Sequence, residues 1–275
     1  MRHQLNSRVI FVSGILFITA MGTIAQAQTA TEKAWNILNA ASSDSSLEKR
    51  AQSIAALGLI TKNPKAQELA EKALKDEKPE VRAAAANALG DMQATDAIPS
   101  LKNALKDPDV GVVMAAAHSL YDLKQPVAYE VYYAVLTGEK KSGQGLMAEQ
   151  KKMLSDPKKM AQFGFEQGIG FIPFAGLGVG AIKALTKDDV SPVRAASAKI
   201  LGNDPDPRSG EALANAASDK SWIVRLAALN ALSRRGEKSL AAKIEPELDD
   251  EKEIVKYTAA ATIIHLSTLP AKTTK

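Results

Sequence analysis

The sequence predicts an all-α protein, an α-solenoid of about six helical hairpins interrupted by one inserted segment rich in glycine and phenylalanine. Three observations support this class. A small group of residues recurs about every 31 positions, which is typical of stacked helix pairs. Alanine-rich runs follow at the same place in most copies, where they favour helix and permit close packing. Aromatic residues make up only 5% of the chain although 45% of it is hydrophobic, which suits closely packed helices.

The chain begins with a predicted signal peptide over residues 1–27. Arg2 and Arg8 precede an apolar run over 9–24, and Ala25-Gln26-Ala27 has the small-residue spacing of a cleavage site. We expect cleavage near Ala27 and export to a periplasm or the cell exterior; a membrane anchor is the alternative. Because the chain contains no cysteine, an exported form has no disulfides and depends on helix packing.

The charge of the mature chain is nearly balanced. The first 27 residues hold two of the 35 basic residues and none of the 31 acidic ones. The remainder is too evenly charged to favour nucleic-acid binding by bulk electrostatics.

Residues 28–43 are expected to form a capping helix over the first repeat. The helix predicted over 30–41 carries Trp35, Ile37 and Leu38, which indicate one apolar face. At the other end of the chain, residues 270–275 are polar and are expected to fray.

Repeats 1–3 occupy residues 44–138 and repeats 4–6 begin at 187, followed by the tail to 275. Each copy has an aspartate, a basic residue six positions later and a leucine-like residue seven further on. The full pattern is present at Asp44/Arg50/Leu57, Asp76/Arg82/Leu89, Asp188/Arg194/Leu201 and Asp219/Arg225/Leu232. It is modified at Asp250/Lys256/Ile263, and Asp107/Val113/Leu120 has lost its basic residue.

Each recurring residue type has an expected structural role. The aspartate can accept hydrogen bonds from free N–H groups before the first helix of its repeat. Gly58, Gly90 and Gly202 follow first helices, where a left-handed C-cap is common. In the second helices, Ile98, Leu101 and Leu105 align with Tyr129, Tyr132 and Leu136, and these columns are predicted to pack in the core.

These residues resemble HEAT repeats, in particular the short HEAT-like repeats of phycobilisome lyases. The resemblance rests on the aspartate, on Val-Arg at 81–82, 193–194 and 224–225, on the alanine pairs and on the closing Leu-Gly. It covers residues 44–269 except 138–187. It implies that aspartate and arginine form a ladder between neighbouring repeats, each exposed pair contributing little stability. An anion-binding stripe of Arg50, Arg82, Arg194 and Arg225 is the less favoured interpretation.

The inserted segment, residues 139–186, lengthens the interval between Asp107 and Asp188 to 81 positions. It holds a polar linker, a lysine-bearing amphipathic helix and an apolar stretch over 163–185 that contains Phe163, Phe165, Phe171 and Phe174. One interpretation is a degenerate helix pair packed against repeats 3 and 4, with Tyr129 and Tyr132 as larger core residues. The other is an exposed apolar element that binds a partner or a membrane surface.

No catalytic, cofactor-binding or metal-ligating pattern is found in the sequence. After the signal peptide the only histidines are His118, expected on a polar helix face, and His265 in the last helix. The stretch GLGVG at 176–180 does not have the spacing of a nucleotide-binding loop. Acidic clusters lie in inter-repeat turns, where capping explains them. We therefore expect no cofactor.

The leading functional hypothesis is an exported, non-enzymatic scaffold that binds a partner protein. Solenoids commonly use a concave face for recognition, expected here to be built from second helices. Tyr133, Phe163, Phe165, Phe171 and Phe174 are the candidate partner-binding residues, since aromatic anchors often dominate binding energy. Deletion of 139–186 is expected to leave a folded array that no longer captures its partner. The alternatives are membrane-surface association through the insertion and, by the resemblance, a bilin-lyase-like enzyme.

Overall fold

The computed structural model describes residues 30–137 and 190–270, and all regular elements in these two ranges are helices. They form two layers. The first helices of the repeats are α2 (Leu47–Leu57), α4 (Pro79–Asp91), α6 (Val110–Asp122), α11 (Ser191–Leu201), α13 (Trp222–Arg235) and α14 (Glu253–Thr268). The second helices are α3 (Pro64–Ala73), α5 (Ile98–Ala104, after the 3-10 turn η1 at Thr95–Ala97), α7 (Val127–Thr137), α12 (Pro207–Ala216) and the 3-10 element η3 (Lys238–Asp249).

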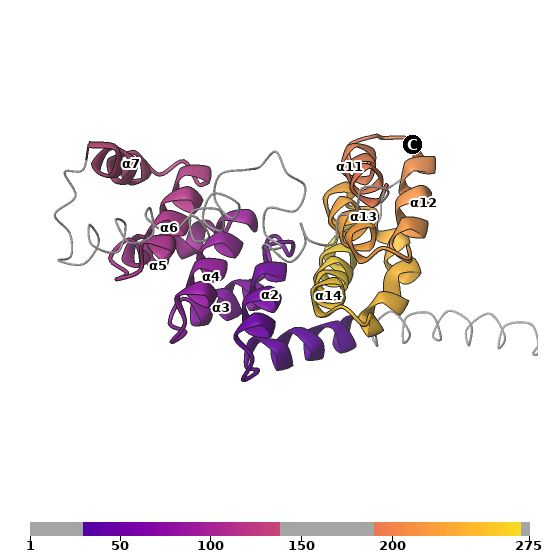
Figure 1. Ribbon diagram of the computed structural model, residues 1–275, viewed down its shortest axis with the longest axis horizontal. Helices are drawn as coiled ribbons and strands as arrows, with labels where there is room; N and C mark the ends of the chain where they lie inside the picture. Colours follow the sequence, from indigo (N-terminus) through magenta and orange to yellow (C-terminus); the bar gives the residue numbers. More distant parts are fainter. Residues whose placement is uncertain (1–29, 138–189, 271–275) are drawn as a thin grey trace, which may run out of the picture.

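The repeats do not stack in the order of the sequence. Along the first layer, α11 packs on α13, α13 on α14, α14 on α2, α2 on α4, and α4 on α6. The spatial order is therefore repeats 4, 5, 6, 1, 2 and 3, so the last repeat adjoins the first. Figure 1 shows this array running from α7 on the left, through α2 and α14 at the centre, to α11 and α12 on the right.

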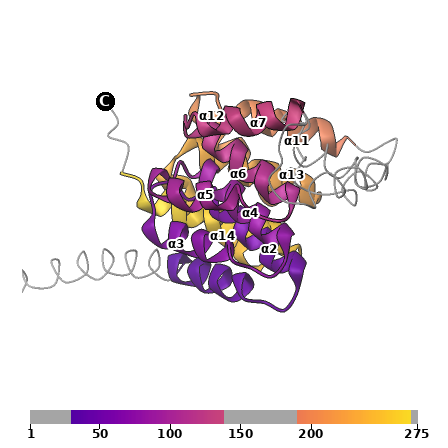
Figure 2. The ribbon, with the colours of Figure 1, turned by 90° about the vertical axis from the view of Figure 1, so that its left-hand side faces the viewer.

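The N-terminal helix, described over residues 30–42, completes repeat 6. That repeat contributes α14 to the first layer, and the described chain ends two residues after this helix. Lys33 of the N-terminal helix pairs with Asp249 of η3 at 2.6 Å, and Lys65 of α3 lies 4.2 Å from the ring centroid of Trp35. The N-terminal helix thus lies between the second helices of repeats 5 and 1. Figures 1 and 2 both show it beneath α2 and α14.

The N-terminal helix, expected from the sequence to cap repeat 1, packs on that repeat but lies in the middle of the array rather than at its end. Ala34 and Leu38 are buried in the same hydrophobic core as α2 and α14. Because α14 covers α2, repeat 1 has no free end, and the N-terminal helix instead holds the two ends of the described chain together.

The array is curved, with the two outer ends, α7 and α11, on the same side in Figure 1. In that view α3, α5 and α12 lie farther from the centre of the curve than α4, α6 and α13. First helices thus line the inner side, contrary to the expectation that second helices build the concave face.

Most of the predicted core columns are confirmed. Leu101, Ile244 and Leu248 of the second helices are fully buried, and Tyr132 packs against the core. Tyr129 is the exception, because 63% of its surface is exposed at the outer end of the array.

Candidate functional site

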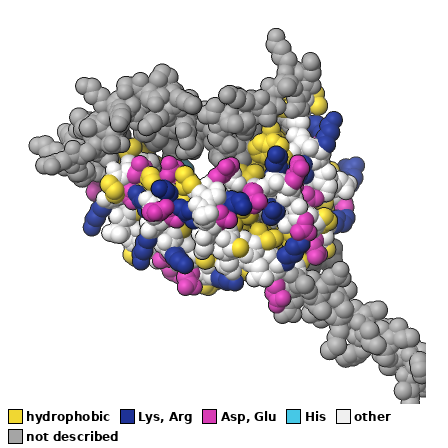
Figure 3. All heavy atoms as spheres, turned by 60° about the horizontal axis from the view of Figure 1, so that its bottom comes forward, with side chains coloured by type: hydrophobic (Ala, Val, Ile, Leu, Met, Phe, Trp, Pro, Cys, Tyr) yellow, Lys and Arg dark blue, Asp and Glu magenta, His cyan; other side chains and the backbone are white. Residues whose placement is uncertain are grey.

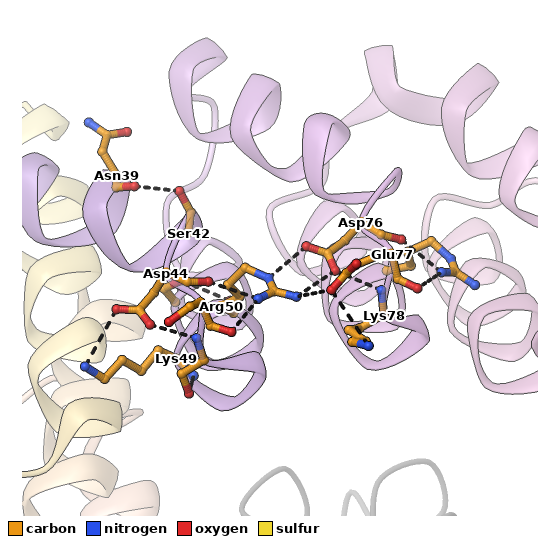
Figure 4. Close-up of polar contacts among 12 residues, drawn as sticks. Asn39, Ser42, Asp44, Lys49, Arg50, Asp76, Glu77 and Lys78 are labelled. Carbon is orange, nitrogen blue, oxygen red and sulfur yellow. Dashed lines mark hydrogen bonds and ion pairs between the residues drawn. The ribbon is translucent and has the colours of Figure 1, made fainter.

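Arginine–aspartate pairs connect four of the five junctions between the described neighbouring repeats. Figure 4 shows Arg50 between repeats 1 and 2, where its Nε and Nη2 donate to the two carboxylate oxygens of Asp76 at 2.9 and 3.1 Å. Its Nη1 also donates to the backbone oxygens of Asp44 and Ser45. One guanidinium therefore joins the turn of its own repeat to the turn of the next.

The same geometry recurs along the array. Arg82 binds Asp107 at 2.7 and 2.8 Å and Arg225 binds Asp250 at 2.6 and 2.9 Å, each through Nε and Nη2, whereas Arg194 binds Asp219 through Nη1 and Nη2. Arg50, Arg82 and Arg225 also donate to backbone oxygens of their own turns, which leaves these three arginines little capacity for the anion-binding stripe considered from the sequence. Asp188 lies outside the described residues.

The pairs are more buried than expected. The side chains of Arg225 and Asp250 retain only 10% and 3% of their exposure, and the Arg50 and Arg82 pairs are similarly covered. Only Arg194 is substantially exposed, at 43%. For the three covered pairs, the loss of one partner would leave a buried charge, so a weak surface ion pair is the wrong description.

The aspartates lie two residues before the N-cap positions of the first helices. Asp76 Oδ1 accepts from the backbone N–H of Lys78 at 2.9 Å, and Lys78 is the N-cap residue of α4. The same bond from the residue two positions later recurs at Asp44, Asp107, Asp219 and Asp250. Each aspartate thus shapes its turn, and all of them except Asp44 also bind the arginine of the preceding repeat. The burial of Asp76 raises the pKa of its carboxyl, but its hydrogen bond from Arg50 and further contacts lower the pKa overall.

The junction between repeats 6 and 1 is built differently. Lys256 has the ladder position in repeat 6, but it forms an ion pair with Glu253 of the same helix, at 3.5 Å. Asp44 of repeat 1 instead pairs with Lys49 at 3.7 Å. Burial and the nearby Glu253 carboxylate raise the pKa of Tyr257 at this junction. The N-terminal helix thus adds a connection where the arginine ladder lacks one.

Glycine in the first helices permits close approach of neighbouring repeats. An added Cβ at Gly90 would lie 2.5 Å from Ser119 Oγ and 2.9 Å from Ser119 Cα, and Ser119 Oγ donates to the Ala86 carbonyl oxygen across this junction. Gly202 similarly faces Ala231. The expected left-handed C-caps are wrong, because Gly58 and Gly202 have right-handed helical φ values of −56° and −59°.

Gly90→Ala is expected to lower the free energy of unfolding by about 1–3 kcal/mol, because α4 and α6 must separate to admit the methyl group. Urea unfolding measures the change. Gly111→Ala is the matched control, since its new Cβ would meet only an Asp109 side-chain oxygen at 3.0 Å. Equal stability of the two variants would contradict this close contact.

Bulky residues replace the small ones at the two outer ends of the array. Tyr121 occupies the position of Gly58, Gly90 and Gly202 in its repeat, fourteen residues after the ladder aspartate. Ile200 occupies the position of Ser119, and 71% of its surface is exposed. Repeats 3 and 4 therefore cannot meet by the close approach seen at Gly90, although they are consecutive in the sequence.

Val113 is consistent with repeat 3 lying at an outer end of the array. This residue stands at the ladder position of repeat 3 and is buried with Ala117 and Val131. Among the described residues no further repeat follows α6 and α7, so an arginine there would have no next aspartate to bind.

The exposed large hydrophobic side chains of the described residues lie at these two ends. We call Tyr121, Tyr129 and Tyr133 the tyrosine end, and Val190, Val193 and Ile200 the aliphatic end. Tyr133, expected from the sequence to bind a partner, is 61% exposed. Phe163, Phe165, Phe171 and Phe174 lie outside the described residues.

Sequence reasoning missed the aliphatic end, although the register contained a signal for it. Val81, Val112, Val224 and Val255 share the column of Val193 and are buried, whereas Val193 is 68% exposed. The signal for an exposed end is Ile200, which is large at a register position that otherwise holds alanine, serine or threonine.

The two histidines of the described residues contact other side chains of the helical repeats. His118 is exposed on α6, as expected, and lies 3.6 Å from Asp122. His265 is buried, with Thr61 of repeat 1 at 3.5 Å, and burial lowers the pKa of its imidazole. Across residues 30–137 and 190–270, no group of three or more histidine, aspartate or glutamate side chains is arranged to hold a metal ion.

The surface has no large region of one charge in the view of Figure 3. Basic and acidic side chains alternate across this face, and hydrophobic side chains form separate small groups. Within the two described ranges, no helix combines the length and apolar character needed to cross a membrane.

Comparison with known proteins identifies the repeat. Residues 36–121 and 179–264 each match HEAT repeats. Human deoxyhypusine hydroxylase is a similar solved structure, with 15% identity over 90% of this chain and 98% of that chain and a TM-score of 0.34. The complex of CpcE and CpcF of phycocyanin lyase from a Nostoc species has 22% identity over 83% and 93%, with a TM-score of 0.34. No curated protein sequence matches the chain.

Proposed function

Because the chain belongs to the HEAT-repeat family, we propose that it is an exported, non-enzymatic scaffold that binds a partner protein through the ends of its array. The observation that carries the proposal is the position of the exposed apolar side chains. In the described residues, the exposed large hydrophobic side chains are confined to the tyrosine end and the aliphatic end. The large hydrophobic side chains of the repeats between these ends are buried or partly buried. Grouped exposed apolar residues are typical of interaction sites.

The uses of the polar groups support a binding role rather than catalysis. Arg50, Arg82 and Arg225 connect repeats, and His265 is buried at the junction of repeats 6 and 1. Export is supported by the predicted signal peptide over 1–27, which lies outside the described residues.

The spatial order of the repeats changes how the insertion must be tested. Residues 139–186 connect repeats 3 and 4, which lie at opposite ends of the array in Figure 1. Five helix-to-helix steps separate these ends, roughly 40–50 Å along the stack. After deletion, the few residues left between Thr137 and Val190 reach only about 18 Å. From this order of the repeats we expect deletion of 139–186 to disrupt the array, which differs from the expectation drawn from the sequence.

Replacement of 139–186 by a glycine–serine linker of equal length avoids this problem. We expect the replaced protein to keep its helical circular dichroism and melting temperature. Partner capture is then measured by quantitative cross-linking and pull-down of the tagged mature protein from its native compartment, with and without the native segment. This comparison separates a contribution of the insertion from that of the ends.

Tyr129→Ser/Tyr133→Ser is expected to reduce the captured partner at least about tenfold, since exposed aromatic anchors often supply 2 kcal/mol or more. Val193→Ser/Ile200→Ser tests the other end in the same way. Lys102→Ser is the matched control, because this exposed residue has the register of Tyr133 in repeat 2. Undiminished capture by both end variants would refute the proposal.

A further inference from the structure

The tyrosine end presents aromatic rings in a defined arrangement. The rings of Tyr121 on α6 and Tyr129 on α7 meet edge to face, with centroids 5.8 Å apart and planes at 81°. Tyr133 follows one helical turn after Tyr129 and is equally exposed. Tyrosine rings that are fixed by such packing offer large contact area at low entropic cost and carry negative potential on their faces.

Two carboxylates adjoin these tyrosines in the sequence. Asp122 follows Tyr121 on α6, and Glu130 follows Tyr129 on α7, where it is exposed. Asp122 lies 3.6 Å from His118, and Glu130 is a second carboxylate at this end. These two carboxylates can attract a cation.

A cation already lies near one of these rings. The Lys124 ammonium is 5.5 Å from the centroid of Tyr121, within the range of a cation–π interaction. Lys124 occupies the turn after α6 with a φ of 60°, so its backbone is held in a left-handed conformation. The tyrosine end thus binds a positively charged side chain of its own turn, which indicates that an external ligand would also be positively charged.

A further HEAT repeat would lack at this end two of the contacts that join repeats 2 and 3. The close approach at Gly90 depends on the missing side chain, and repeat 3 has Tyr121 in that column. Ladder bonding requires an arginine, where Val113 is buried. An extended segment that lies across the rings needs neither contact.

We propose that the tyrosine end, together with Asp122 and Glu130, binds an arginine- or lysine-bearing peptide segment of the partner. This inference rests on the proposed function and specifies the chemistry of one end. A guanidinium or ammonium group stacks on the exposed tyrosine faces, and the carboxylates neutralise its charge. Because these groups lie at the surface, binding weakens as salt screens them.

The test uses the full mature chain and a fluorescein-labelled twelve-residue peptide in which four arginines alternate with glycine and serine. Fluorescence anisotropy at low salt is expected to give a dissociation constant in the range of about 10–500 μM. The same peptide with citrulline for arginine keeps the planar side chain without its charge and is expected to bind at least about tenfold more weakly. A peptide with glutamate at these positions is expected not to bind.

Variants locate the binding. Tyr129→Leu and Asp122→Asn are each expected to weaken the arginine peptide about three- to tenfold, because each removes one part of the cation site. Asp96→Asn changes an exposed carboxylate of repeat 2 outside the site and is expected to leave affinity unchanged. Circular dichroism and melting temperature confirm that each variant is folded.

Equal affinity for the arginine and citrulline peptides, or unchanged affinity in both site variants, would overturn the inference. So would the absence of arginine-peptide binding at low salt. In these cases the proposed scaffold function stands if Tyr129→Ser/Tyr133→Ser still abolishes partner capture, since the partner would then be recognised by other chemistry. Peptide binding without any loss of capture would instead refute the proposed function at this end.

Discussion

Arg225→Met is expected to lower the free energy of unfolding by about 3 kcal/mol or more. Arg225 binds both carboxylate oxygens of Asp250 and the backbone oxygen of Asp219. The methionine fills most of the volume but leaves Asp250, whose side chain is 3% exposed, without its buried counter-charge. Urea unfolding at neutral pH measures the loss.

Two further variants distinguish a buried ladder from an ordinary surface pair. Arg225→Met/Asp250→Asn removes the stranded charge but keeps an acceptor for the Lys252 N–H, so it should recover much of the stability. Arg208→Met breaks the exposed pair with Asp206 and should change stability far less. If Arg225→Met and Arg208→Met proved equally mild, the ladder would not hold the repeats together.

Leu38→Asp is expected to destabilise both halves of the array by at least about 4 kcal/mol, because it places a charge in the core beneath α2 and α14. Hydrogen exchange provides the specific measurement. Protection should fall in α14 as well as in α2, although 215 residues separate Leu38 from the start of α14.

Asn36→Asp is the matched control, since it adds the same charge on the exposed side of the same helix. Its stability and exchange should resemble those of the unchanged protein. If Leu38→Asp loosened α2 while α14 kept its protection, the N-terminal helix would be only a cap on repeat 1, and the completed sixth repeat would be wrong.

The candidate site was only partly predictable from the sequence. Tyr133 could be placed on an exposed column by its alignment with Lys102, and the structure exposes it. Tyr129 was misplaced, because its column is buried in inner repeats and the sequence does not reveal that repeat 3 lies at an outer end. Val193 and Ile200 were overlooked for the same reason at the opposite end.

By itself the sequence determined the all-α repeat, its register and the residues that could join one repeat to another. These features depend on local spacing, such as six residues from aspartate to arginine, and recur often enough to be recognised. Only the tertiary structure decided which repeats are neighbours. The repeats share one spacing, so periodicity cannot distinguish a contact between repeats 3 and 4 from one between repeats 6 and 1. The bulk of Tyr121 and Ile200 disfavours contact between repeats 3 and 4. The N-terminal helix supplies the second helix of repeat 6 and stabilises the contact between repeats 6 and 1.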